Sequence, residues 1–256
     1  MSCVTAARWQ RRARPLLGTL VEIGWRGHSV GEGEAIEAAF AAIALVQSEL
    51  SRFEPASEVS RFNAMPAGAH IALSDSGLDV FTAADELRAL TVGLFDITLG
   101  SAPNGWRIDG AQLVKLDARA RIDLGGIAKG HAVDRAVAAL IAHGCPAGWV
   151  NAGGDLRAFG GAEVPVMLRD EAQGGVREFA TLCDGAFATS HFAPPSRSPW
   201  HASLWSAGGT QPEWLHVSVA APRCLWADAL TKIVAASGDA EHPALARYDA
   251  RAWLHG

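Results

Sequence analysis

The sequence predicts a mixed α+β fold in which helices cover mixed sheets, and three observations support this prediction. Hydrophobic residues make up 49% of the 256 residues and charged residues 19%, which is typical of a packed globular protein and excludes a disordered chain. Helical and β-type patterns both occur, but they do not alternate strictly, which disfavours a doubly wound parallel sheet. No repeat or clear linker divides the chain, so we expect a single domain over 1–256, with residues 1–15 as a candidate flexible extension.

Four helices are predicted from apolar residues that recur at helical spacing. In the third helix the pattern ends at Gly144, a residue typical of a left-handed helix terminator. In the fourth, Trp226, Leu230 and Ile233 share the side that we expect to be buried. The predicted helices span about 34–50, 76–91, 129–143 and 225–237.

Short β-type runs lie between and after these helices. The predicted strands span about 19–25, 113–116, 120–124, 147–151, 155–159, 164–169, 186–190 and 215–221. The stretch 193–212 is rich in Pro, Ser and Gly and is predicted to be a long loop, of a length that is often functional in compact domains.

The charge and hydropathy patterns exclude several classes of partner. Lys plus Arg is 22 against 27 Asp plus Glu, a net charge of -5, which argues against nucleic acid and anionic membranes as partners. No apolar stretch approaches the roughly 18 residues of a membrane span. Arg11-Arg12 resembles the start of a twin-arginine export signal, but the apolar residues after it run into Glu22 without a small-residue cleavage site. We therefore expect a cytoplasmic protein.

The segment 123–134 (DLGGIAKGHAVD) carries the strongest chemical signal. A β-type run ends in Gly125-Gly126, Lys129 follows, and a helix begins. Consecutive glycines let a ligand approach the backbone, and a helix N-terminus offers free N–H groups to an anion. The segment predicts a phosphate or pyrophosphate cradle, although a plain tight turn is the alternative. It has neither the P-loop nor the G-x-G-x-x-G spacing.

A second glycine pair follows another β-type run in the segment Val150–Asp155. Here Asn151 and Asp155 flank Gly153-Gly154 at the mouth of a predicted turn. Asp155 is placed to bind sugar hydroxyls or to accept from backbone N–H groups. A purely structural turn is the alternative interpretation.

A third group of polar residues lies on the last predicted helix. Asp228, Thr231 and Lys232 are spaced i, i+3 and i+4, so they share one face. The simpler interpretation is an Asp–Lys ion pair within the helix. The other is a Mg²⁺ site, because Mg²⁺ prefers hard oxygen ligands and completes its shell with substrate phosphates.

The histidines and serines do not form the motifs of common hydrolases. None of the nine histidines has H-x-x-x-H or H-E-x-x-H spacing, and no G-x-S-x-G motif occurs, which disfavours a zinc hydrolase and a serine hydrolase. His191 and His201 flank the Pro/Ser-rich loop and are the candidate functional histidines, with an ordinary surface histidine as the alternative for each.

Taken in order, these segments resemble one known family. The matching pieces are Leu17–Thr19, Ser51–Phe53, Ser57–Asn63, Gly93–Thr98, Asp123–Asp134, Val150–Asp155, Ala188–Ser190 and Ala227–Leu230. They run nearly end to end, and the 123–134 segment is the most specific. In this set of motifs the chain resembles the FAD:protein FMN transferase family, also called the ApbE family.

The resemblance implies a T-fold-like α+β domain that binds FAD as a substrate in a cleft. It further implies Mg²⁺-assisted transfer of the FMN phosphoryl group to a Thr or Ser hydroxyl of an acceptor protein, with AMP as leaving group. Two alternatives remain: a flavin-binding protein without transfer activity, and a Mg²⁺-dependent FAD pyrophosphatase that uses water as acceptor.

The resemblance also implies roles for particular residues. Metal binding falls to the backbone carbonyl of Ala128, the carboxylate of Asp228 and Thr231. The expected catalytic residues are Asp228, His201, Thr231 and Lys232. The expected FAD-binding residues are Ser57, Glu58, Asp96, Asp123, Gly125, Gly126, Lys129, Asp134, Asn151, Gly153, Gly154 and Asp155.

The chain departs from the family pattern in two places. Many members have a Thr four residues after the metal-binding Asp, and here that position is Lys232. Either Lys232 supplies a fixed cation in place of the metal, or it points away while Thr231 binds the ion. The second departure is around His201, which keeps the family's His without the Asp-Pro that follows it, and at Ser190-His191, where the family has Ser-Gly.

Overall fold

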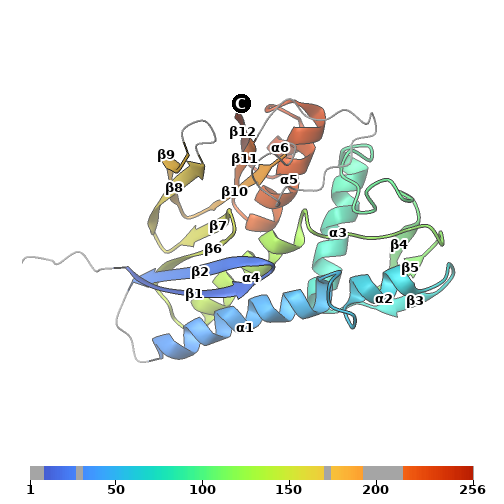
Figure 1. Cartoon of the computed structure of the whole chain (residues 1–256), viewed down its shortest axis with the longest axis horizontal. Helices are drawn as coiled ribbons and strands as arrows, with labels where there is room; N and C mark the ends of the chain where they lie inside the picture. Colours follow the sequence, from blue (N-terminus) through green and yellow to red (C-terminus); the bar gives the residue numbers. More distant parts are fainter. Residues whose placement is uncertain (1–8, 27–30, 170–173, 193–215, 256) are drawn as a thin grey trace, which may run out of the picture.

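The computed structural model describes residues 9–26, 31–169, 174–192 and 216–255, and its largest element is a seven-stranded sheet (Figure 1). Neighbouring strands in this sheet are all antiparallel. The α+β class is therefore confirmed. In spatial order the strands are β1 (Gln10–Leu16), β2 (Thr19–Arg26), β6 (Ala147–Ala152), β7 (Asp155–Phe159), β10 (Ala186–His191), β11 (His216–Ala221) and β12 (Arg251–His255).

The two faces of this sheet are covered by different elements. Helices α4 (Ala128–Ala142) and α5 (Cys224–Ser237) pack on one face, and α1 (Glu32–Leu50) packs against α4 from outside. On the opposite face, the hairpin of β8 (Glu163–Arg169) and β9 (Val176–Cys183) covers a second, smaller apolar cluster. Strand residues that alternate between the two faces therefore meet either helices or this hairpin.

A smaller group of elements lies beside the main sheet, on the right in Figure 1. It consists of α2 (Glu58–Ala64), β3 (His70–Ala72), α3 (Asp75–Leu90), β4 (Trp106–Asp109) and β5 (Gln112–Lys115). Its three-stranded sheet has the order β3-β5-β4. Lys115, at the end of β5, is buried and donates from Nζ to the carbonyl oxygens of Phe62 (3.1 Å) and Asn63 (3.3 Å), so it caps the end of α2. The short α6 (Ala244–Arg247) precedes β12.

The four helices predicted from periodicity are confirmed, with ends that agree within two residues. The strand predicted over 120–124 is wrong. Its apolar residues are buried, but the backbone of Ile122 is held by a side chain instead of a neighbouring strand: Ile122 N donates to Asn63 Oδ1 (2.7 Å), and Asn63 Nδ2 donates to the Ile122 carbonyl (2.9 Å).

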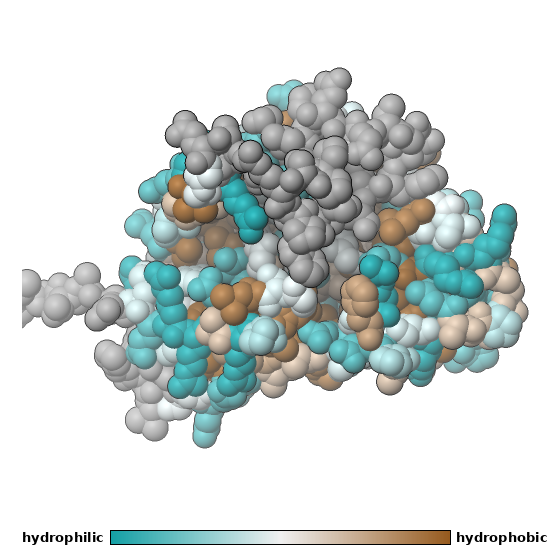
Figure 2. Space-filling view, in the orientation of Figure 1, coloured by the Kyte–Doolittle hydropathy of each residue, from teal (hydrophilic) through white to brown (hydrophobic). Residues whose placement is uncertain are grey.

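Residues from Gln10 onward belong to the sheet, which corrects the expectation of an extension over 1–15. They form β1, which pairs with β2 along its whole length. The strand escaped prediction because its side chains between Gln10 and Leu16 are exposed on both faces, so no apolar alternation marks it. Arg12 and Arg14 form ion pairs with Glu37 of α1. Hydrophilic side chains gather on the side of the molecule where β1 and α1 lie (Figure 2). Charged side chains of this kind protect an edge strand from further pairing.

His131 of α4 should make the protein sensitive to mild acid. Its side chain is 1% exposed, and neither ring nitrogen has a hydrogen-bond partner among the described residues. Burial lowers the pKa of His131 from 6.5 to about 4. Protonation of His131 therefore favours the unfolded state. Above pH 6.5 this group does not lower the free energy of unfolding, and as the pH falls from 6.5 towards 4 that free energy decreases.

We expect the free energy of unfolding in urea to fall by about 2 kcal/mol between pH 7 and pH 4.5 through this group. His131→Leu should remove this component from the pH dependence, whereas the same substitution at the exposed His70 should leave it unchanged. Identical pH profiles for wild type and His131→Leu would contradict the assignment to His131.

No helix in the described ranges is long and apolar enough to cross a membrane.

Candidate functional site

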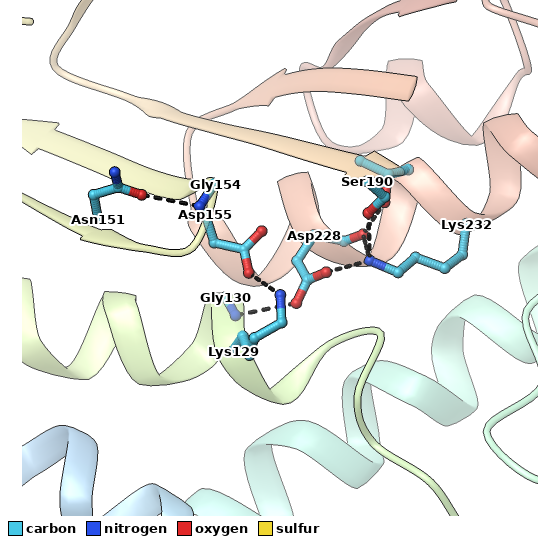
Figure 3. Close-up of polar contacts among 9 residues, drawn as sticks. Lys129, Gly130, Asn151, Gly154, Asp155, Ser190, Asp228 and Lys232 are labelled. Carbon is cyan, nitrogen blue, oxygen red and sulfur yellow. Dashed lines mark hydrogen bonds and ion pairs between the residues drawn. The ribbon is translucent and has the colours of Figure 1, made fainter. Parts of the chain in front are cut away.

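Segments that lie far apart in the sequence bring five polar side chains together between the main sheet and its helices (Figure 3). Lys129 comes from the start of α4, Asp155 from the start of β7 and Ser190 from β10. Asp228 and Lys232 come from α5. We call these five residues the charge cluster. Lys129 and Asp155 form one ion pair, and Asp228 and Lys232 form another.

The segment that leads into α4 is held in place by hydrogen bonds and an ion pair. Asp123 accepts a hydrogen bond from the backbone N–H of Gly125 at Oδ1 (2.8 Å), and its Oδ2 pairs with Arg52 Nε (3.1 Å). The Asp123 N–H donates to the carbonyl of Ile97 (2.8 Å). These contacts, together with the Asn63 clamp on the preceding residue, hold the glycine pair in one place. Asp123 thus shapes the turn.

Gly126 and Gly130 are required for close packing rather than for an unusual backbone conformation. A Cβ on Gly126 would lie 3.1 Å from Cε of Lys232. A Cβ on Gly130 would lie 2.2 Å from the carbonyl oxygen of Cys224, so the first turn of α4 touches the backbone of α5 at this point. The glycines therefore let α5 and its charged side chains approach the start of α4.

The second glycine pair forms the two-residue turn between β6 and β7. Gly153 (φ 64°) and Gly154 (φ 106°) both have a left-handed backbone, as hairpin turns of this length require. The Asn151 Oδ1 accepts from the N–H of Gly154 (3.1 Å). Asn151, Gly153 and Gly154 therefore all take part in forming this turn. Asp155, by contrast, points from the start of β7 towards α4 and enters the charge cluster (Figure 3).

The ion pairs of the charge cluster lie in a mostly dry environment. The side chain of Asp228 is 0% exposed and that of Asp155 2%, whereas that of Lys129 is 33% exposed. Burial and repulsion from Asp228 raise the pKa of Asp155. Burial also opposes ionisation of Asp228, but Lys129 and Lys232 outweigh it and lower the pKa of Asp228. Burial opposes the charge of Lys129 too, yet the two carboxylates raise its pKa. Lys129 therefore stays charged, and its side chain is the more exposed partner of its ion pair with Asp155.

A hydrogen-bond network joins α5 to β10. Lys232 Nζ donates to Ser190 Oγ (2.9 Å) and to the Asp228 carbonyl (3.1 Å), besides its ion pair with Asp228 Oδ1. Thr231 donates to the same carbonyl (2.7 Å) and shares a hydrogen bond with Ser190 (2.8 Å). The predicted Asp–Lys ion pair is thus present. The hydroxyl of Thr231 is engaged away from the carboxylate of Asp228.

Helices α4 and α5 each cap the first turn of the other. Asp134 of α4 accepts from the backbone N–H groups of Cys224 (2.9 Å) and Leu225 (3.1 Å), while Asp228 of α5 accepts from the N–H of Gly130 (3.2 Å). Neither helix has a side-chain cap of its own. Asp134 also pairs with Arg157 (2.6 Å). Its carboxylate therefore positions α5, and with it Asp228.

Three of the expected FAD-binding residues stabilise the smaller group of elements. Ser57 caps α2 by accepting from Ser60 N–H (3.0 Å). Glu58 accepts from the N–H of Ser74 at the start of α3 (2.7 Å), and burial raises its pKa. Asp96 closes its own loop by accepting from the N–H groups of Thr98 (2.8 Å) and Gly100 (2.9 Å). The structure does not bring these side chains into the charge cluster.

The two candidate histidines differ in what the structure says of them. His201 lies outside the described residues. His191 follows Ser190 on β10, so its side chain is on the opposite face of the sheet from the charge cluster, where it contacts His216 (3.2 Å between ring nitrogens). Sequence reasoning gave no role to Ser190, although its alternation with Ala188 would have placed it on the helix-covered face.

The residues around Asp228 do not fit a divalent cation. Both carboxylate oxygens already accept from protein donors, Lys232 and the Gly130 N–H, and Thr231 is turned to the backbone. In the parts of the chain that the structure describes, no group of three or more His, Cys, Asp or Glu side chains is arranged to hold a metal ion. Two of the three expected ligands, Asp228 and Thr231, therefore have their side-chain oxygens engaged by protein groups and do not offer Mg²⁺ the open oxygen ligands that it takes.

Comparison with known proteins identifies the fold. Flavin transferase ApbE from Vibrio cholerae superposes with a TM-score of 0.83 at 20% identity, covering 97% of this chain and 93% of that chain. The ApbE protein from Thermotoga maritima gives 0.83 at 22% identity, covering 96% and 94%. Flavinyl transferase ApbE from Pseudomonas stutzeri gives 0.76 at 21% identity, covering 91% and 86%. No curated protein matches the chain in sequence.

The sequence itself also matches the family model. The model described as "ApbE family" aligns with residues 17–115 and 106–254, which together include the smaller group of elements, the glycine-rich segment and the charge cluster. This match, over nearly the whole chain, agrees with the fold and with the order of the sequence motifs. The chain therefore belongs to the ApbE family.

Proposed function

We propose that this protein transfers the FMN part of FAD to a Thr or Ser hydroxyl of an acceptor protein and releases AMP. The observation that carries the proposal is the position of Lys129, a charged and partly exposed lysine at the start of α4. It follows closely after Gly125-Gly126, which we call the glycine segment. A partly exposed cation beside a pair of glycines, where a ligand can approach the backbone closely, suits an anion such as a pyrophosphate. Membership of the ApbE family and the similarity to two flavin transferases support the same ligand.

The proposed reaction breaks one phosphorus–oxygen bond and forms another. The acceptor hydroxyl oxygen bonds to the phosphorus on the FMN side, the bond from that phosphorus to the bridging oxygen breaks, and AMP leaves with the bridging oxygen. The hydroxyl proton passes to a base, a role that we propose for His201. Positive charge beside the phosphates stabilises the negative charge that builds up as the bridge breaks. Lys129 is the residue best placed to supply it.

Mg²⁺ assistance, which family resemblance alone would imply, is not part of this proposal because the surroundings of Asp228 do not fit the ion. The residues proposed to line the FAD site are those of the glycine segment and the charge cluster. Asp134, Asn151 and Asp123 act by positioning these elements.

The direct test is mass spectrometry of a Thr-containing acceptor domain after incubation with this protein, FAD and Mg²⁺. We expect the acceptor to gain the mass of FMN less one water, with AMP formed in equal amount. FAD that stays intact and bound would instead indicate a binding protein, and FAD split to FMN and AMP beside an unmodified acceptor would indicate a pyrophosphatase.

Substitution of Lys129 should weaken FAD binding in a way that depends on its charge. We expect Lys129→Met to raise the dissociation constant for FAD about 10- to 100-fold, because a charge-assisted contact is lost, and Lys129→Arg to recover part of it. Arg107→Met removes a cation outside the cluster, where Arg107 pairs with Asp109, and is the matched control. Unchanged FAD binding in a folded Lys129→Met protein would remove Lys129 from the site.

A further inference from the structure

Three oxygen atoms surround the ammonium of Lys232 on α5. These are a carboxylate oxygen of Asp228, the backbone carbonyl of Asp228 (3.1 Å) and the hydroxyl of Ser190 (2.9 Å) (Figure 3). We propose that the Lys232 ammonium takes the place of a divalent cation at Asp228, so that this protein binds the pyrophosphate of its donor without a metal ion. The inference rests on the proposed function for the identity of that ligand.

Each oxygen of the buried Asp228 carboxylate already contacts a protein donor. Its Oδ1 contacts Lys232, its Oδ2 accepts from the N–H of Gly130 (3.2 Å), and the side chain is 0% exposed. A divalent ion could bind there only by displacing the ammonium, and the two positive charges would repel each other at short range. The three N–H donors of Lys232 match the three surrounding oxygens in number, so each donor has an acceptor.

The charges of the cluster balance only because residue 232 is a lysine. Asp155 and Asp228 contribute two negative charges, and Lys129 and Lys232 contribute two positive charges. With a Thr at position 232 the same cluster would carry a net negative charge and would repel a pyrophosphate unless a cation joined it. Lys232 supplies that charge covalently, which removes the electrostatic need for a metal.

Gly126 leaves space for the Lys232 side chain because it has no Cβ. The Lys232 side chain runs across Gly126, whose missing Cβ would lie 3.1 Å from Cε, 3.4 Å from Cγ and 3.5 Å from Cδ. The ammonium is thereby brought next to the glycine segment proposed to receive the phosphates. Any other residue at 126 would crowd the lysine stem. The stem of Lys232 therefore packs directly against Gly126.

Two measurements on the unmodified protein test the inference. The first is Mn²⁺ titration followed by electron paramagnetic resonance, which reports metal binding without FAD. The second is FAD binding, followed by flavin fluorescence, in Mg²⁺ and in EDTA. We expect no Mn²⁺ site that depends on Asp228, and FAD dissociation constants in Mg²⁺ and EDTA that agree within about twofold.

Substitution of Lys232 by Thr should make FAD binding depend on a metal ion. In Lys232→Thr we expect a new Mn²⁺ site, lost again when Asp228→Asn is added, and FAD binding that EDTA weakens by about tenfold or more. Lys232→Met removes the charge without supplying an oxygen ligand, so Mg²⁺ should restore FAD binding less well than in Lys232→Thr. Circular dichroism and urea unfolding establish that each variant is folded before it is compared.

The outcomes separate this inference from the proposed function. Mn²⁺ binding to wild type that disappears in Asp228→Asn would overturn the inference, whether or not FAD binds. FAD binding by wild type that requires Mg²⁺ would also overturn it, while leaving the proposed function intact. Failure to bind FAD in either condition would overturn the proposed function, and the Mn²⁺ titration would still decide whether Lys232 excludes a metal from Asp228.

Discussion

Asp228→Asn should lower the free energy of unfolding by about 3–5 kcal/mol, the range found when one partner of a buried ion pair is removed. The substitution is nearly isosteric, but it leaves the buried Lys232 ammonium without its counter-charge and weakens the acceptor for the Gly130 N–H. Urea unfolding at pH 7 measures the loss. Because Asp228 also holds α5 against α4, FAD binding should weaken in the same variant.

A double-mutant cycle distinguishes the ion pair from general damage to the helix. Lys232→Met removes the ammonium, and the double variant Asp228→Asn/Lys232→Met should lose less stability than the sum of the two single variants, with a coupling of about 2 kcal/mol. Asp109→Asn is the matched control, because it breaks an exposed ion pair with Arg107 and should cost less than about 1 kcal/mol. Similar losses at positions 228 and 109 would contradict a buried pair.

Gly130→Ala should destabilise the protein by about 3 kcal/mol, at the upper end of the range for overpacking. The added Cβ would lie 2.2 Å from the carbonyl oxygen of Cys224 and 2.9 Å from Cβ of Asp228. Both atoms belong to the framework of α5, so the two helices must move apart. The displacement should also weaken FAD binding, because Asp228 and Lys232 move with α5.

The control is the same substitution in a helix where space is open. Gly33 of α1 has nothing within 4 Å of its missing Cβ and is exposed. Gly33→Ala should therefore stabilise the protein by about 0.5–1 kcal/mol through helix propensity alone. Urea unfolding of the two variants should give opposite signs. Stabilisation by Gly130→Ala would show that α4 and α5 do not approach as closely as the structure indicates.

The sequence was most informative where the interacting residues are close together in the chain. The four-residue spacing of Asp228 and Lys232 predicted their ion pair, and Gly153-Gly154 predicted the turn that precedes Asp155. The glycines and lysine of 123–134 marked the start of α4. In each case the geometry follows from helical periodicity or from the backbone conformations that glycine allows.

The sequence was least informative where tertiary packing decides the partner. Lys129 and Asp155 lie 26 positions apart, and Lys232 and Ser190 lie 42 apart, so no local pattern joins them. The family resemblance implies a role in FAD binding for Asp134, but no local pattern shows its contacts with Arg157 and with the backbone N–H groups that begin α5. The apolar pattern around Ile122 predicted a strand. Such a pattern does not show that the backbone hydrogen bonds of Ile122 are made by the Asn63 side chain instead of a neighbouring strand.

Because α4 and α5 cap each other, we expect their first turns to unfold together. Unwinding the first turn of α5 removes Asp228 from the Gly130 N–H, and unwinding the first turn of α4 withdraws support from the segment that carries Asp134. Each helix start takes its side-chain hydrogen bonds from the other helix, although the bonded residues lie 98 and 90 positions apart in the chain. The two turns therefore form a single cooperative unit of local unfolding. Their assembly waits for a long-range contact during folding, and once formed it leaves the charged groups of the site in a fixed arrangement before any ligand arrives.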